Sequence, residues 1–485
     1  MAFDLVFFGG TGDLVWRKLM PALFQAFRHG TLPDAGRIIG VGRDDLSDEQ
    51  YRQQIQSRFE QVEGDKRPKP EEFARFASLL CYVRMDLSQP AAYAALASRL
   101  AERETDHVVM YLSTAPSLFT TVCEQLAASG LNTPKTRIVL EKPLGHDLAS
   151  NRAINHAVGL AFKEQQVFRI DHYLGKPAVQ NLFAMRFGNA LFEPLWRREH
   201  IANIQITMSE ELGVEKRGGF YETTGALRDM VQNHALQLLC AIAMEPPINA
   251  HADAIRDEKL KVLRALKRWT PETLSQHVIR GQYSAGNIEG KAVPGYREER
   301  GVDPQSSTET FVALRTEIAN WRWAGVPFYI RTGKRMASRE AHIDINFRPT
   351  PHEIFKSPVG QVNKLVIHLQ PKDGLELHLF AQGQSKRGQG NGTLSPVHLD
   401  LDFDKRFGSE RVGAYERLLL DVLDGRLNLF VRSDEQEEAW RWVEPILQHW
   451  QGDTNGPRPY AAGTWGPSAA SAMIARDGFC WSEEN

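Results

Sequence analysis

The feature that most constrains the fold is a glycine-rich turn near the start of the chain. The stretch FFGGTGDLVWRKL, residues 7–19, places three glycines between an apolar run and a cationic, amphipathic segment. A strand ending in Gly10-x-Gly12 lets a diphosphate approach the backbone amides, and the helix that follows directs its positive N-terminal end at the anion. The third glycine of the common fingerprint is replaced by Val15, so the match is incomplete and a simple tight turn is the alternative.

The rest of the first third predicts a parallel sheet around that turn. Continuous apolar runs alternate with helical patterns, as in strands covered on both faces. The predicted strands are residues 5–8, 37–42, 107–113 and 137–143. Between the first two, apolar residues recur at helical spacing until Gly30, with a kink expected at Pro21. This β, α, β order is typical of a Rossmann-like, doubly wound fold and favours the dinucleotide interpretation.

The end of the second predicted strand bears on the choice of cofactor. NAD sites usually carry an acidic residue there, whereas GVGRDD, residues 40–45, presents Arg43 first. A guanidinium group at this position can pair with a 2'-phosphate, which favours NADP. The alternative for Arg43 is a solvated surface residue, and the adjacent Asp44 leaves NAD open as a secondary cofactor.

Composition excludes several classes of partner. The net charge of −2 over 485 residues provides no electrostatic footprint for nucleic acid or a membrane surface. The N-terminal residues resemble neither a signal peptide nor a membrane span, so we expect a cytoplasmic protein. The four cysteines are widely spaced, which predicts free thiols and no metal site. The glycine- and serine-rich residues 383–392 predict a hairpin loop.

Two polar stretches are candidates for a substrate site. Residues 169–182, RIDHYLGKPAVQNL, bring His172 and Lys176 onto one face if the segment is helical, where they could hold a phosphate dianion. An exposed turn ending at Gly175 is the alternative. In residues 225–244, His234 lies beside a buried helical stripe. Such a histidine is more often a core residue, but a neutral imidazole steadied by a carboxylate can also serve as a general base.

The motifs GGTGDLVWRKL, EKPLG, RIDHYLGK, RDMVQNH and PFYIRTGK, in this order, resemble those of the glucose-6-phosphate dehydrogenase family. The resemblance continues through AYERLLLDVLDG and YAAGTWGP and so covers nearly the whole chain. It implies oxidation of glucose 6-phosphate at C1 to 6-phosphoglucono-lactone, with hydride transfer to NADP, as the first step of the oxidative pentose phosphate pathway.

The resemblance also implies roles for individual residues. It makes His234 the catalytic base and Asp171 the carboxylate that orients it. It implies that the substrate is bound by His172, Tyr173, Lys176, Glu210, Asp229, Lys334, Arg339 and Lys142. It implies that the cofactor is bound by Gly9, Gly10, Thr11, Gly12, Asp13, Leu14, Arg43 and Lys142. The sequence leaves the isomer of the Lys142–Pro143 bond open.

We expect two domains, with a boundary near residue 175. Residues 1–175 form the dinucleotide-binding domain, and residues 176–485 form a larger α+β domain for substrate binding and dimerisation. Alternating apolar and polar residues predict a mostly antiparallel sheet in the second domain. Its predicted strands are residues 203–209, 342–347, 364–371, 375–381 and 398–403. The resemblance implies a homodimer, or a dimer of dimers, formed through this sheet.

Two other functions remain open at this point. A related oxidoreductase acting on an unphosphorylated aldose would have no use for His172 and Lys176 as a pair. A catalytically silent sensor of NADP or sugar phosphate would have lost the base, whereas all the matched positions here carry chemically competent residues.

Overall fold

The structure is a computed structural model that describes residues 2–33, 35–61, 67–352, 354–355, 362–382, 394–408 and 412–484. The predicted hairpin loop at 383–392 lies outside the described residues. The chain divides into two compact units. The first comprises residues 1–175, 248–256 and 412–437, and the second comprises residues 176–247, 257–411 and 438–485.

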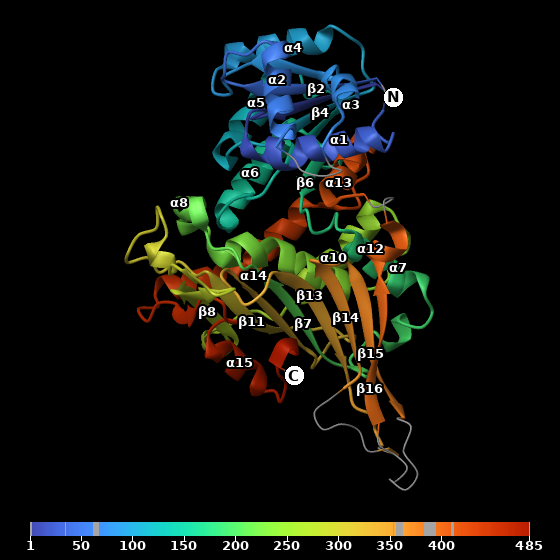
Figure 1. The fold of residues 1–485 in the computed structure, drawn as a ribbon, viewed down its shortest axis with the longest axis vertical. Helices are drawn as coiled ribbons and strands as arrows, with labels where there is room; N and C mark the ends of the chain where they lie inside the picture. Colours follow the sequence, from blue (N-terminus) through green and yellow to red (C-terminus); the bar gives the residue numbers. More distant parts are fainter. Residues whose placement is uncertain are drawn as a thin grey trace. The chain divides into compact units, whose positions relative to one another are not determined.

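The first unit is built on a seven-stranded sheet in the order β17-β6-β5-β4-β1-β2-β3 (Figure 1). Its strands are β1 (Ala2–Phe8), β2 (Ala35–Gly42), β3 (Leu80–Arg84), β4 (His107–Leu112), β5 (Thr136–Leu140), β6 (Val167–Ile170) and β17 (Phe430–Val431). All neighbouring strands are parallel except β17, which runs antiparallel to β6. The chain therefore winds outward from β1 in both directions, and the predicted Rossmann-like architecture is confirmed.

The helices of this unit are α1 (Met20–Arg28), α2 (Asp48–Phe59), α3 (Pro70–Ala77), α4 (Tyr93–Ala101), α5 (Phe119–Ala128), α6 (Leu148–Ala161) and α13 (Ala414–Asp424). The single helix predicted after the glycine turn is present, with a π-helical stretch in its first half. Val15–Leu19 form a π-helix, and Pro21 lies in the first turn of α1. The π-helix runs into α1 without a break, so Pro21 lies inside one continuous helix, where its missing N–H leaves a carbonyl oxygen of the preceding turn without its helical donor.

Residues 248–256 and 412–437 were expected in the second domain, but they lie in the first unit. Residues 412–437 contain α13, which packs against α1, and β17, which covers the edge of β6. Arg137 of β5 donates to the carbonyl oxygens of Val422, at 2.7 Å, and Leu423. The unpaired backbone groups of an edge strand can pair with another chain, and β17 occupies those of β6 at Arg169 and Ile170. Local sequence patterns carry no sign of such a distant pairing.

The second unit is built on a nine-stranded sheet in the order β16-β15-β14-β13-β7-β12-β11-β8-β18. Its strands are β7 (Ile201–Ser209), β8 (Val278–Ser284), β11 (Phe311–Glu317), β12 (Pro327–Gly333), β13 (Glu340–Phe347), β14 (Lys364–Gln370), β15 (Gly374–Gln382), β16 (Leu394–Asp402) and β18 (Arg458–Ala461). Only the pairs β7–β12 and β8–β18 are parallel, so the sheet is mostly antiparallel, as predicted. A separate hairpin consists of β9 (Gly286–Ile288) and β10 (Lys291–Val293).

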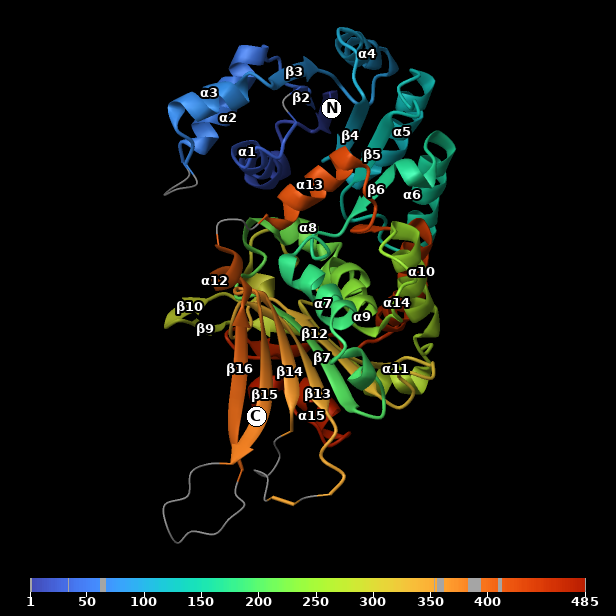
Figure 2. The same cartoon turned by 90° about the vertical axis from the view of Figure 1, so that its right-hand side faces the viewer.

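Helices cover part of this sheet. The π-helix Leu227–Ala235 contacts β12, while α7 (Pro177–Gly188) packs against β14 and against α9 (Leu236–Ala243), as Figure 2 shows. Other helices of this unit are α8 (Gly218–Glu222), α11 (Pro271–His277), α12 (Phe403–Phe407) and α15 (Ser468–Ala475). The chain passes between the units within α10 (Ala252–Ala265) and α14 (Ser433–Gln451). In the described part of the chain, no helix has the length and apolar character needed to cross a membrane.

Candidate active site

The glycine turn after β1 is required by the packing of the sheet itself. Gly9 has a positive φ of 85°, which favours glycine. A Cβ atom at Gly10 would lie 2.5 Å from the Cα of Gly40 in β2. The N–H groups of Gly9 and Gly10 both donate to the carbonyl oxygen of Val41, at 2.9 and 2.8 Å. At Gly10, therefore, the missing side chain makes room for the neighbouring strand rather than only for a ligand.

The carboxyl ends of β2 and β3 bring polar residues next to this turn. The Asp44 carboxylate accepts a hydrogen bond from the hydroxyl of Thr11 at 2.8 Å. Arg43 is exposed at the end of β2. Arg84, at the end of β3, lies opposite Gly42 in the strand register and pairs with Asp45 at 3.2 Å. Sequence reasoning missed Arg84 because β3 was not among the predicted strands. Arg43 and Arg84 thus lie at the ends of two neighbouring strands.

The segment that follows β6 is a turn and not a helix. Its predicted alternative, an exposed turn, is also wrong because Asp171 and Tyr173 are buried. The Asp171 carboxylate accepts the backbone N–H of Tyr173 at 2.9 Å, which stabilises the turn. A Cβ atom at Gly175 would lie 2.8 Å from the carbonyl oxygen of Ala414, so the tight packing of α13 explains this glycine.

Buried aromatic and acidic residues accompany this turn in the first unit. The His172 ring stacks on Tyr415, with the centroids 5.9 Å apart and the planes 8° from parallel. The Tyr111 hydroxyl donates to Glu141 at 2.6 Å. Burial raises the pKa of the Glu141 carboxyl. It also raises the pKa of Tyr415, with further contributions from the carboxylates of Glu141 and Asp171. Glu141 and Tyr415 were not singled out from the sequence.

Lys142 follows Glu141 directly and is partly buried. The bond between Lys142 and Pro143, left open by the sequence, is cis.

In the second unit, His234 lies on the π-helix Leu227–Ala235 and is only 1% exposed. The buried stripe expected around it is present, although the helix is π and not α in this stretch. π-helical turns occur often at functional sites. At the start of this helix, the Glu309 carboxylate accepts the N–H of Leu227 at 3.0 Å, and burial raises the pKa of that carboxyl. Asp229 lies in the first turn of the same helix.

Glu210 and Lys334 directly follow the parallel neighbours β7 and β12, and their side chains form an ion pair. The Lys334 ammonium group lies 5.2 Å from the centre of the Tyr221 ring. Burial raises the pKa of Tyr221 well above its ordinary value, and the nearby carboxylates, Asp229 first among them, add to this. The structure therefore brings Glu210, Lys334 and Asp229 to one region around Tyr221.

Lys176 and Arg339 have different environments. Lys176 immediately precedes α7, and its ammonium group donates to the Gln370 side chain at 3.0 Å and to the Leu369 carbonyl at 3.3 Å, at the end of β14. Both of these partners are uncharged groups. Arg339 is exposed, just before β13.

Two family models match the chain almost end to end. The model described as "Glucose-6-phosphate dehydrogenase, NAD binding domain" matches residues 6–181, and "Glucose-6-phosphate dehydrogenase, C-terminal domain" matches residues 183–482.

Individual proteins show the same similarity. The chain is 48% identical to the glucose-6-phosphate 1-dehydrogenase of Rhizobium meliloti, over 99% of this chain and 98% of the relative. A crystal structure of the Mycobacterium avium enzyme of that name has 36% identity and a TM-score of 0.83, over 99% of this chain and 98% of that one. A structure described as glucose-6-phosphate dehydrogenase in complex with its substrate glucose-6-phosphate has 32% identity and a TM-score of 0.88, over 99% and 98%.

Proposed function

Because the chain belongs to the glucose-6-phosphate dehydrogenase family, we propose that it oxidises glucose 6-phosphate at C1 to 6-phosphoglucono-lactone, with NADP as the hydride acceptor. This is the first step of the oxidative pentose phosphate pathway. The observation that carries the proposal is the similarity over the full chain to a dehydrogenase whose structure holds glucose 6-phosphate.

Oxidation at C1 requires a base for the hydroxyl proton. His234 takes that proton at an imidazole nitrogen, and Asp171 orients the ring and stabilises the imidazolium that forms. A buried histidine suits this role because exclusion of water strengthens its interaction with a carboxylate.

The other residues hold the sugar phosphate. The phosphate does not react, but binding it fixes C1 against the base, and such positioning can contribute several kcal/mol. The family motif assigns Lys176 to this task, and its ammonium group lies just before α7, beside the end of β14. His172 and Tyr173 complete the phosphate site, while Glu210, Asp229, Lys334, Arg339 and Lys142 contact the sugar or lie between it and the cofactor.

The first unit suits a dinucleotide. A Cβ atom at Gly12 would lie 3.0 Å from the Gly9 carbonyl oxygen, which favours glycine there, and the start of the helix that follows the turn suits a diphosphate. A bound nicotinamide cofactor would supply the acceptor for the hydride that leaves C1. Arg43 pairs with the 2'-phosphate of NADP. The Asp44 carboxylate can accept a hydrogen bond from the ribose hydroxyl of NAD, which makes NAD a secondary cofactor.

We also propose a homodimer, or a dimer of dimers, formed through the large sheet. The edge strand β16 exposes Val397, Leu399 and Leu401 on one face, with exposed fractions of 41, 62 and 47%. They lie beside Leu379, Leu377 and Leu375 of β15. An exposed apolar face on an edge strand favours association. Light scattering should report twice or four times the chain mass, and Leu399→Lys should shift it towards the monomer; a monomeric parent protein would contradict the proposal.

One assay tests the main proposal. NADPH and NADH formation should be followed by absorbance, with glucose 6-phosphate and with glucose as substrates. We expect rapid NADPH formation with glucose 6-phosphate as substrate and not with glucose. Equal rates with glucose would indicate an oxidoreductase of unphosphorylated sugars, and no turnover with tight binding of NADP would indicate a sensor.

A further inference from the structure

The helix that carries His234 ends in a buried cluster of donors. The π-helix continues into α9 without a break, and the last carbonyl groups of a helix have no helical partner. Here Arg186 of α7 donates to the carbonyl oxygens of Ala241, at 3.0 Å, and of Ile242 and Met244, both at 2.8 Å. One side chain thus fastens α7 to the end of α9.

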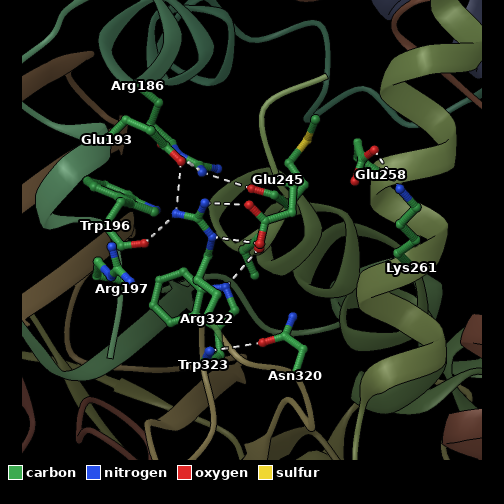
Figure 3. A network of polar contacts seen from close by, with 12 residues as sticks. Arg186, Glu193, Trp196, Arg197, Glu245, Glu258, Lys261, Asn320, Arg322 and Trp323 are labelled. Carbon is green, nitrogen blue, oxygen red and sulfur yellow. Dashed lines mark hydrogen bonds and ion pairs between the residues drawn. The ribbon is translucent and has the colours of Figure 1, made fainter. Parts of the chain in front are cut away.

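Arg186 is itself held in place by a network of charged and aromatic residues (Figure 3). Its side chain is fully buried and pairs with Glu193 at 3.1 Å. Glu193 also binds Arg322 at 2.8 Å, and Arg322 forms a second ion pair with Glu245. The Arg186 guanidinium lies 5.2 Å from the centre of the Trp196 ring.

Burial lowers the pKa of Arg186 to about 10, so the group stays charged at neutral pH. A cation at the negative end of a helix is electrostatically favourable, and the carbonyl groups accept hydrogen bonds from both Nη atoms of Arg186.

The two helices joined by Arg186 carry two residues with different proposed roles. Lys176 lies at the start of α7, ten residues before Arg186, or about 15 Å along the helix. His234 precedes α9 on the other helix. The phosphate and C1 are at opposite ends of the substrate, so its binding to Lys176 and its reaction at His234 depend on the spacing between these helices.

We propose that Arg186 is a positioning residue that sets this spacing, so that a substrate whose phosphate is held by Lys176 presents C1 to His234. This inference rests on the proposed function. A misplacement of about 1 Å can lower a rate about a hundredfold. Loss of the Arg186 contacts should therefore lower kcat, while the affinity for the sugar phosphate, which depends on Lys176, is retained.

The chain offers a matched control at the same helix end. The Trp323 indole donates to the Ala243 carbonyl at 2.8 Å and is fully buried, but Trp323 is not part of α7. Trp323→Phe removes a hydrogen bond from the end of α9 without changing the attachment to α7. It should lower the melting temperature and leave kcat within about twofold of the parent value.

Arg186→Lys is the informative variant because it keeps the charge and loses the planar fork of donors. We expect kcat to fall about tenfold or more. The dissociation constant of glucose 6-phosphate, measured by calorimetry, should stay within about twofold. The deuterium isotope effect on kcat, with substrate deuterated at C1, should increase because misalignment slows the chemical step. A purely structural role would not change the isotope effect.

The inference is overturned if Arg186→Lys and Trp323→Phe have equal kcat per folded molecule, or if the loss in Arg186→Lys lies only in substrate affinity. If Arg186→Lys does not fold, Glu193→Gln is the test, because it keeps Arg186 and removes the charge that anchors it. It should lower kcat in the same way by a smaller factor, and a normal kcat would overturn the inference. Failure of the proposed function is seen separately, as absence of glucose 6-phosphate oxidation by the parent protein.

Discussion

Glu210 and Lys334 form an ion pair although 124 positions separate them in the sequence. They follow β7 and β12, which are parallel neighbours in the large sheet, so the two strands deliver both side chains to the same edge. The resemblance assigned each residue to the substrate independently. Because the structure pairs them, we expect the two residues to act on the substrate as a unit.

The first prediction tests that pairing. Glu210→Gln and Lys334→Ala should each raise the KM for glucose 6-phosphate about tenfold, since each removes one charged hydrogen-bond partner. The double variant should be scarcely worse than the poorer single variant. Initial rates over a range of substrate concentrations give these constants. Additive losses would mean that the two side chains contact the substrate separately.

The second prediction concerns the cofactor. Arg43→Ala should raise the KM for NADP about ten- to hundredfold, because a charge-assisted pair contributes about 1.5 to 3 kcal/mol. The KM for NAD should change little. Arg58→Ala, which removes an exposed arginine on α2, serves as a control and should affect neither constant. An equal loss with both cofactors would contradict the assignment of Arg43 to the 2'-phosphate.

The third prediction concerns the phosphate site. Lys176→Ala should lower kcat/KM for glucose 6-phosphate about ten- to hundredfold. The much slower turnover of free glucose should be nearly unchanged, because glucose has no group for this lysine to hold. Rates with both substrates on the same preparation provide an internal control. Parallel losses would mean that Lys176 supports the fold or the chemistry instead.

The fourth prediction concerns the proposed base. His234→Asn should lower kcat at least about a hundredfold, while calorimetry should still detect binding of NADP and glucose 6-phosphate. Asp171→Asn should also be strongly impaired, and the double variant should be little worse than either. The parent rate should rise with pH through the ordinary range of histidine, and this rise should vanish in His234→Asn. Near-normal turnover of a folded His234→Asn protein would make His234 a core histidine.

The fifth prediction concerns stability and pH. Burial raises the pKa of Asp421, in α13, from 3.8 to about 6. The folded protein therefore holds this proton more tightly than the unfolded chain, and the resulting stabilisation is present below about pH 4 and lost as the pH rises to about 6.

Asp421→Asn stays neutral throughout and should stabilise the protein by about 1 to 2 kcal/mol at about pH 8, a value reduced to allow for solvent screening. The gain should disappear at about pH 4. Thermal unfolding at the two pH values measures the difference, and an equal effect at both would show that the Asp421 charge does not matter.

Several features could be predicted because they depend on neighbours in sequence. Apolar runs and alternation identified the strands at 107–113 and 203–209, since these periods follow from backbone geometry. The glycines at 9–12 identified the turn after the first strand. The motifs were enough to identify the family, because several short polar stretches recur in order along one chain.

Other features depended on packing between distant segments. Gly10 is glycine partly because Gly40 of β2 approaches it, and the order of strands decides that approach. The turn at 171–176 is buried in part because α13, more than 230 residues later in the chain, packs against Gly175. Arg84 lies beside Arg43 only because β3 pairs with β2.

The sequence by itself determined the fold class, the family and the residue types available for catalysis, because those follow from local periodicity and short motifs. The tertiary structure decided that residues 412–437 complete the first unit, that Glu210 pairs with Lys334, and that Arg186 fastens α7 to α9. Each of these joins residues far apart in the chain. Their free energy comes from burial and from hydrogen bonds that exist only once the strands and helices have packed, so no local pattern encodes them.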